Sequence, residues 1–259
     1  MNRAPAVAGS FYPADAATLS HMLNGFLEHA ASGTQAPKAI IAPHAGYIYS
    51  GPIAASAYAR LKPVRDSISR VVLLGPSHRV AFQGLAVSAA DTFTTPLGSI
   101  AVDRKAIEQL RQLPFVGYLE QAHALEHSLE VHLPFLQQTL SNFKLVPIVA
   151  GDASPHQVSQ VLDMLWGGDE TLIVISSDLS HYHDYTTAQK LDRHTSDLIE
   201  ALDYHTLSSK AACGKVPVGG LLKLLREKSL HIKTIDLRNS GDTAGDKYRV
   251  VGYGAYVVE

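Results

Sequence analysis

Short runs of apolar residues alternate with amphipathic stretches along most of the chain. Four apolar runs, each followed by small or turn-forming residues, predict strands at 39–42, 71–74, 145–149 and 172–175. Segments with helical spacing lie around and between them, at about 15–30, 52–61, 103–112, 128–140, 155–166, 187–201 and 217–228. Strands that alternate with helices predict an α/β protein with a central mixed, largely parallel sheet flanked by helices.

Two regions break this alternation. Residues 85–102 predict two short strands joined through 91–98, which would form a hairpin-like insertion. Near the carboxyl end, 231–237 and 248–258 are separated by turn-forming residues and predict another antiparallel pair. The sequence contains no internal repeat and no Gly/Ser-rich linker, so we expect a single domain over 1–259.

One of the four predicted strands contains a proline. Pro147 lies in the middle of the run 145–149, and proline has no backbone N–H to donate to a neighbouring strand. We therefore expect this strand at an edge of the sheet, or with irregular pairing.

The charge balance and the single cysteine exclude several classes of protein. The 259 residues carry 22 basic and 24 acidic side chains, a formal net charge of −2, which argues against a nucleic-acid partner. One cysteine forms no internal disulfide and excludes zinc sites built from several cysteines. No apolar stretch reaches the roughly 18 residues of a membrane helix, and no secretory signal is evident. We expect a cytoplasmic protein without a membrane partner.

Histidines follow three of the four predicted strands. His44 follows the first strand, His78 the second, and Asp178 and His181 the fourth. The third strand is followed by Asp152 and by no histidine, which is a weaker signal of a ligand. Because ligands gather beyond the carboxyl ends of parallel strands, we expect these side chains to converge at one edge of the sheet. Imidazole nitrogens bind transition metals and also exchange protons near neutral pH. Asp178 is a candidate for a ligand, an orienting group or a proton acceptor.

The only cysteine lies in a loop-like segment. Cys213 stands among glycines just before a predicted helix, and Lys215 is close by in the sequence. A helix amino terminus and a neighbouring cation favour the thiolate, which is the form that binds metals. The alternative is a buried, inert thiol, which is the usual state of a free cysteine.

A further pair of histidines lies in the segment 126–132. His127 and His132 are five residues apart, about 140° around a helix, and do not match the His-Glu-x-x-His spacing of zinc proteases. We expect both of them, with Tyr47, to line a substrate pocket. The alternative is that this segment starts a helix, with its acidic and serine side chains bound to backbone amides.

Six segments, taken together, resemble the Memo family, whose bacterial and archaeal members are called AmmeMemoRadiSam system protein B. These segments run in order over nearly the whole chain, at 8–13, 42–47, 74–78, 126–134, 176–181 and 213–214. The resemblance implies the α/β fold of the class III extradiol ring-cleaving dioxygenases, with a pocket at the carboxyl edge of the sheet.

The resemblance also implies roles for individual residues. His44 and His78 match the two histidines that bind iron(II) in the dioxygenases, and Cys213 stands where those enzymes have a glutamate. His181, with Asp178 beside it, matches the acid–base histidine. A sulfur ligand softens such a site and moves its preference toward copper, zinc or thiolate-bound iron. We expect Fe²⁺ as the cofactor, with copper and zinc as alternatives.

Three functions are compatible with these residues. The first is a metal-dependent dioxygenase-like oxidoreductase acting on a small substrate. The second is a non-catalytic binding or scaffold protein, for a peptide or phospho-ligand, or for AmmeMemoRadiSam system protein A and radical SAM proteins, with which microbial members are associated. The third is a metal-dependent hydrolase. No feature of the sequence selects the substrate.

Overall fold

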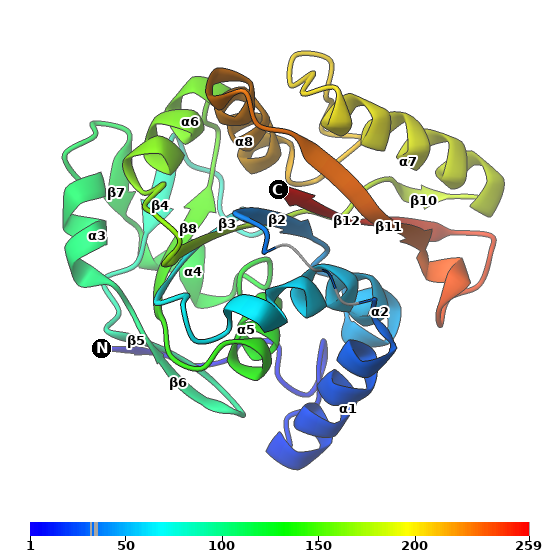
Figure 1. The fold of residues 1–259 in the computed structure, drawn as a ribbon, viewed down its shortest axis with the longest axis horizontal. Coiled ribbons are helices and arrows are strands. Elements are labelled where there is room, and N and C mark those ends of the chain that lie inside the picture. The colour runs from blue at the N-terminus through cyan, green and yellow to red at the C-terminus, as the bar shows by residue number, and fades with distance from the viewer. Residues whose placement is uncertain (32, 34–35, 259) are drawn as a thin grey trace.

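The centre of the molecule is a mixed sheet (Figure 1). The computed structural model describes residues 1–31, 33 and 36–258. Four parallel strands lie side by side in the middle of the sheet, in the order β2 (Ala39–Ala42), β9 (Thr171–Ser176), β3 (Arg70–Pro76) and β8 (Lys144–Ala150). All four were predicted from their apolar runs. Because these strands are parallel, their carboxyl ends meet at one edge.

Antiparallel strands extend the sheet on both sides. In the described part of the chain the sheet has nine strands. On one side β12 (Val250–Val258) pairs with β2, and β10 (His181–His183) and β11 (Ile232–Asn239) pair with β12. On the other side β4 (Leu85–Val87) pairs antiparallel with β8 and parallel with β7 (Val116–Tyr118). The predicted carboxyl-terminal pair and the predicted α/β class with a mixed sheet are confirmed.

The region 85–102 differs from its prediction. The hairpin consists of β5 (Thr92–Thr95) and β6 (Gly98–Ala101), and β1 (Asn2–Arg3) pairs with β5 to complete a separate small sheet. Residues 85–87, which we expected in the hairpin, belong to the main sheet instead. The sequence pattern alone does not reveal this, because their partner β8 lies about sixty residues away along the chain.

Pro147 does not mark an edge strand, but the pairing on one side of its strand is irregular, which is the other alternative that we expected. Its strand β8 is flanked by β3 on one side and by β4 on the other. The carbonyl of Leu145 accepts the N–H of Asp103 at 2.8 Å on the side away from β3, and Pro147 faces that same side. The ladder with β4 ends at Ile148, so the missing N–H of Pro147 has no strand partner to lose.

Helices cover both faces of the sheet. In Figure 1, α6, α7 and α8 lie on one side, and α1, α2 and α5 on the other. Their bounds, with those of two short helices at the edge, are α1 Ala16–His29, α2 Tyr47–Tyr58, α3 Arg104–Leu110, α4 Glu120–Ala124, α5 Leu133–Thr139, α6 Pro155–Met164, α7 Tyr185–Glu200 and α8 Lys215–Lys228.

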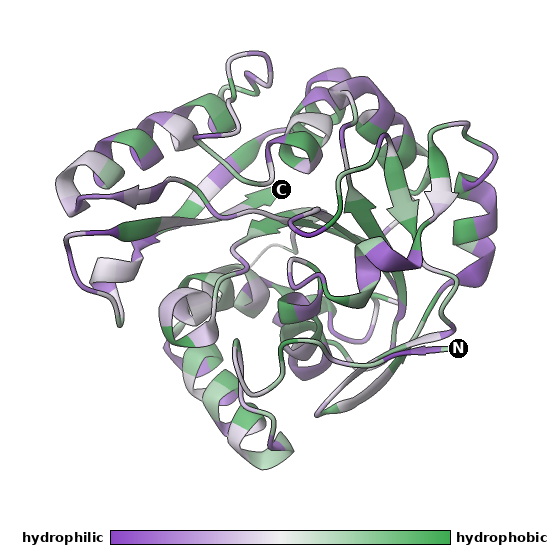
Figure 2. Cartoon of the chain, turned by 180° about the vertical axis from the view of Figure 1, so that it is seen from behind, coloured by the Kyte–Doolittle hydropathy of each residue, from purple (hydrophilic) through white to green (hydrophobic). Residues whose placement is uncertain are grey.

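The packing follows the hydropathy of the segments. Figure 2 shows hydrophobic residues along the central strands and hydrophilic residues on the outer surfaces of the helices. Every residue of β9 is buried, as expected for a strand covered on both faces. The predicted helix 128–140 begins instead with a 3-10 turn at Glu130–His132. None of the described helices is both long and apolar enough to cross a membrane.

Candidate metal centre

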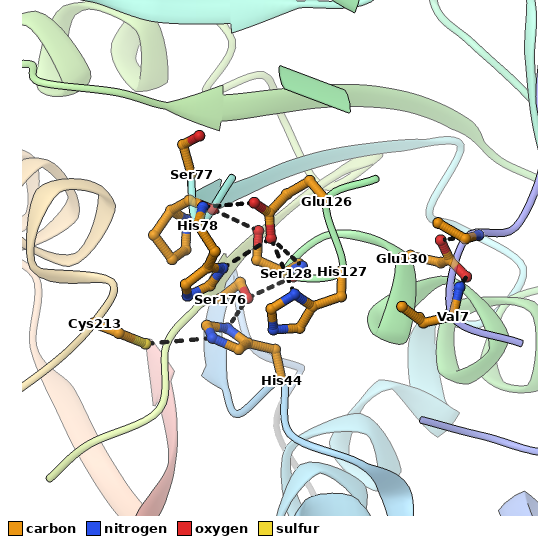
Figure 3. A network of polar contacts seen from close by, with 12 residues as sticks. Val7, His44, Ser77, His78, Glu126, His127, Ser128, Glu130, Ser176 and Cys213 are labelled. Atoms are coloured by element: carbon orange, nitrogen blue, oxygen red, sulfur yellow. Dashed lines mark hydrogen bonds and ion pairs between the residues drawn. The ribbon is translucent and has the colours of Figure 1, made fainter. Parts of the chain in front are cut away.

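Two histidines and the cysteine meet at the carboxyl edge of the sheet. His44 follows β2, His78 follows β3, and Cys213 lies just before α8. One ligand atom from each of the three lies within 4.8 Å of the others, and Nε2 of His44 is 3.3 Å from Sγ of Cys213 (Figure 3). The convergence that the strand ends predict is present in the structure. An imidazole pair with one sulfur is a donor set suited to a transition-metal ion.

A serine on β9 orients His44. The hydroxyl of Ser176 donates to the carbonyl of Ser128 at 2.6 Å, so the 2.6 Å contact between Ser176 Oγ and His44 Nδ1 requires that Nδ1 carries the proton. Nε2 of His44 then has a free lone pair directed toward Cys213. Burial, with His78 and His127 nearby, holds the pKa of His44 well below its usual value. His44 is therefore a neutral imidazole, which is the form that binds metals.

A buried carboxylate orients His78. Glu126 accepts the backbone N–H of His78 at 2.6 Å and contacts its Nδ1 atom at 2.8 Å. Burial opposes ionisation of Glu126, but the hydrogen bonds from His78 and from the N–H of Ser128 hold its pKa at about 2. The carboxylate is therefore charged at neutral pH and accepts from Nδ1–H. This leaves Nε2 of His78 free, in the carboxylate–histidine arrangement common at metal sites.

The sequence left two states of Cys213 open: a thiolate, favoured by the start of α8 and by Lys215, and a buried thiol. Burial and the nearby Asp178 carboxylate raise the pKa of the Cys213 thiol to about 12, and Lys215 points its charge into solvent as an exposed residue. In the metal-free protein the sulfur is therefore a thiol. A bound cation is the factor that would convert it into a thiolate ligand.

Asp178 lies directly behind the ligands. Its Oδ1 atom accepts the backbone N–H of His44 at 2.7 Å, and its own N–H donates to Sγ of Cys213 at 3.2 Å. Its Oδ2 atom is 3.9 Å from Nε2 of His44. The residue is buried, and this burial raises the pKa of its carboxyl group above the usual range. Asp178 thus fixes both His44 and Cys213.

A cavity of about 580 Å³ opens beside this cluster. Asp178, His181 and His127 line it, as do Tyr182 and Arg249. The ring of His127 stacks on that of His78, with centroids 4.6 Å apart and planes at 25°. We call this space the first cavity. It places the predicted acid–base residues, Asp178 and His181, and the predicted pocket residue His127 on one surface.

Tyr47 and His132, which we expected in the pocket, lie in the core instead. Tyr47 is 2% exposed and donates its hydroxyl to the carbonyl of Val131 at 2.6 Å. His132 is 1% exposed, and its Nδ1 atom is 2.8 Å from the hydroxyl of Tyr58. Neither is among the described residues that line the first cavity. The hydroxyl of Tyr47 and the Nδ1 atom of His132 thus have local partners in the core, whereas the Nε2 atom of His132 has no hydrogen-bond partner among the described residues.

The orienting groups were not predicted. Glu126 appears in the sequence beside His127, and Ser176 stands at the end of a strand next to Asp178, but neither spacing indicates a contact with a ligand histidine. The loop containing Glu126 reaches His78 across 48 residues, and Ser176 reaches His44 across 132. The one available signal is that Ser176 and Ala42, which lies two residues before His44, end neighbouring parallel strands.

The donor set fits a single metal ion. Both histidines present an unprotonated Nε2 atom because their Nδ1 atoms are engaged, and a sulfur completes the group. A second group of three potential ligands, His78, Glu126 and His127, also lies within 4.8 Å. In that group Glu126 already accepts hydrogen bonds from two backbone amides and from His78, so its carboxylate serves to orient rather than to bind.

Comparisons with known proteins agree over almost the whole chain. A family model described as Memo-like protein matches residues 3–257. A MEMO1 family protein from Aquifex aeolicus is 37% identical over 263 residues, which cover 97% of each chain. One from Sulfolobus acidocaldarius is 35% identical over 280 residues, covering 98% of each. The crystal structure of an uncharacterised protein from Escherichia coli K12 has a similar fold, with a TM-score of 0.53 and 15% identity over 86% of this chain and 100% of that one.

Proposed function

This chain belongs to the Memo-like protein family, and we propose that it is a metal-dependent oxidoreductase related to the extradiol dioxygenases, acting on a small substrate in the first cavity. His44, His78 and Cys213 would hold one metal ion. The observation that carries this proposal is the orientation of the two imidazoles. Ser176 and Glu126 each engage an Nδ1 atom, and each histidine thereby presents its Nε2 atom to the same small space.

We propose Fe²⁺ as the ion, with copper and zinc as alternatives. Three protein ligands on one side leave positions open for small molecules, as in the iron sites with two histidines and one carboxylate. When bound, the ion would supply Lewis acidity and a redox couple. The sulfur of Cys213 softens the donor set, so the alternatives are copper and zinc rather than magnesium or calcium.

The side chains around the first cavity would handle the proton. His181 lines this cavity and would accept a proton from a substrate hydroxyl and return it later. Asp178 lies on the same surface and is fixed by its hydrogen bond from His44. It would orient His181 or the substrate rather than exchange with solvent. His127, stacked on His78, would form one wall against a planar substrate.

The experiment measures metal binding first and turnover second. Protein purified without chelators should contain close to one metal ion per chain by elemental analysis. His44→Ala, His78→Ala and Cys213→Ser should each lose it, whereas His231→Ala, which alters an exposed histidine, should retain it. Equal metal content in all four variants would contradict the proposed site.

Turnover separates the enzyme from the binding protein. Protein loaded with Fe²⁺ under anaerobic conditions should consume oxygen when it is mixed with oxygenated buffer and a member of a catechol panel. His181→Ala should lower this rate while leaving the metal content unchanged. Metal binding without oxygen uptake, together with binding to AmmeMemoRadiSam system protein A or to a radical SAM protein, would instead support the scaffold function. Release of an acid from an ester panel without oxygen uptake would support the hydrolase.

A further inference from the structure

Cys213 also lines a second cavity. This space, of about 500 Å³, is bordered by the loop that follows β3, by the end of β8 and by the start of α8. Val80, Phe82 and Val216 form its apolar walls, and Asp152 and Cys213 complete it. Among the described residues, the lining of this second cavity shares no member with that of the first. Among the described residues that line the two cavities, Cys213 is the one proposed metal ligand, so the second cavity gives direct access to a ligand atom.

Asp152 is held in a fixed position on the second cavity. Its backbone N–H donates to the carbonyl of Phe82 at 2.8 Å, and its carbonyl accepts the N–H of Gly84 at 2.8 Å. Its carboxylate accepts from the side-chain amide of Gln83 at 2.9 Å and is otherwise exposed. It is the one charged residue among the described residues that line this cavity. A fixed, uncompensated negative charge at an opening attracts cations.

The first cavity is less favourable to a cation. Arg249 lines it, and its guanidinium group lies 5.0 Å from the centre of the Tyr182 ring without an ion pair among the described residues. One carboxylate there, Asp178, is buried and bound to the N–H of His44. The other, Asp246, accepts the backbone N–H groups of Tyr248 and Arg249. The first cavity thus carries a positive charge beside its carboxylates, whereas Asp152 shares the second cavity with no basic side chain among the described residues that line it.

We propose that the metal ion reaches its site through the second cavity, with Asp152 as the first anionic contact and Cys213 as the first ligand. This inference rests on the metal site proposed above. It gives a role to Asp152, which follows the third predicted strand and is not one of the proposed ligands. It also separates the two routes, so that a molecule held in the first cavity would not block metal uptake or loss.

The test is the rate of metal uptake, followed with Co²⁺. Cobalt bound to a thiolate has a charge-transfer absorption that a stopped-flow instrument records. Asp152→Asn retains a side-chain oxygen for Gln83 but removes the charge. Uptake should therefore slow roughly sevenfold, which is the effect of removing one charge about 7 Å from a divalent cation in water. The matched variant Asp246→Asn removes a charge from the first cavity and should take up Co²⁺ at the wild-type rate. The equilibrium affinity should be unchanged in both.

A second variant tests the route by size. Val216→Trp should fill much of the second cavity and slow both Co²⁺ uptake and alkylation of Cys213, which is the chain's single thiol. Slower uptake in Asp246→Asn, with wild-type uptake in Asp152→Asn, would overturn the route and assign it to the first cavity. Equal rates in all variants would also overturn it. Failure of the wild-type protein to bind Co²⁺ at all would overturn the metal site itself, which distinguishes the two failures.

Discussion

The Nδ1 atom of His78 lies 2.8 Å from Oε1 of Glu126, and the other oxygen of the same carboxylate accepts the His78 backbone N–H at 2.6 Å. Both the ring and the backbone of this histidine are therefore fixed by one side chain. The next turn of the same loop supplies the Ser128 carbonyl, which accepts from Ser176 and so sets the proton on His44. One loop thus orients both histidines.

Replacing Glu126 with Gln should weaken metal binding by roughly 10- to 100-fold, the usual effect of losing a group that orients a ligand. The amide no longer carries the charge that fixes Nδ1–H of His78, so the ring can rotate or change tautomer. Competition with a chromophoric chelator measures the affinity. The control is Glu120→Gln, which alters a carboxylate bound to Ser88 and the Ala89 amide instead. Equal affinities of the two variants would contradict the orienting role.

Replacing Ser176 with Ala should weaken metal binding by about tenfold, because His44 loses the acceptor that holds the proton on Nδ1. Either nitrogen can then carry it, and the population that presents a free Nε2 atom falls. Ser196→Ala is the control, since that buried hydroxyl bonds to Tyr256 instead. Nitrogen-15 spectra of the histidines would show the tautomer directly. An unchanged His44 tautomer in Ser176→Ala would refute the explanation.

The sequence predicted those features of the site that depend on strand order. His44 and His78 each follow a continuous apolar run, and parallel strands bring such positions to one edge. Cys213 was placed there by resemblance to a family rather than by periodicity, because it belongs to a loop. Tyr47 and His132 were expected in the pocket from their neighbours in sequence, but side-chain direction depends on packing, and both rings are directed into the core.

Long-range contacts account for most of what the sequence did not predict. Leu85–Val87 joins the main sheet through β8, and Pro147 is tolerated there because the partner strand stops one residue short of it. Neither fact is encoded in the local pattern. The buried charge of Glu126 is another such case. A glutamate in a polar segment is usually solvated, and only the folded chain shows it directed at His78.

The protein should lose stability as the pH falls below about 6.5, in part because of His123. Burial lowers the pKa of this histidine from 6.5 to about 4, and its Nδ1 atom has no hydrogen-bond partner among the described residues. The unfolded chain therefore binds a proton that the folded chain does not. The contribution of His123 to the free energy of unfolding is complete above pH 6.5, the pKa of a histidine in the unfolded chain. At pH 5 this contribution is smaller by about 2 kcal/mol.

Urea unfolding at pH 7 and pH 5 measures this dependence. His123→Gln retains a donor for the Ala86 carbonyl but does not titrate, so its free energy of unfolding should change less between the two pH values than that of the wild type, by about 2 kcal/mol. His231→Ala, at an exposed position, should leave the wild-type difference intact. A pH dependence shared by all three proteins would assign the effect to other groups.

The amino-terminal segment should be important for stability through Glu130. The carboxylate of this residue is fully buried and accepts from the hydroxyl of Tyr12 at 2.6 Å, from the N–H of Val7 at 2.9 Å and from Arg3, whose side chain is 6% exposed. Arg3 also donates to the carbonyl of Glu126 at 2.7 Å, which links this cluster to the loop that orients His78. The charge of Glu130 therefore compensates a buried guanidinium.

Glu130→Gln should lower the free energy of unfolding by about 3–5 kcal/mol at pH 7, because the Arg3 charge stays buried without its counter-charge. Glu108→Gln, which breaks an exposed pair with Arg111, should cost less than about 1 kcal/mol. In the double variant Arg3→Met/Glu130→Gln the buried charge is gone, so the loss should be smaller than the sum of the two single losses. Strictly additive losses would show that Arg3 and Glu130 do not depend on each other, and the stability of the amino-terminal segment would then come from the contacts of Glu130 with Tyr12 and Val7.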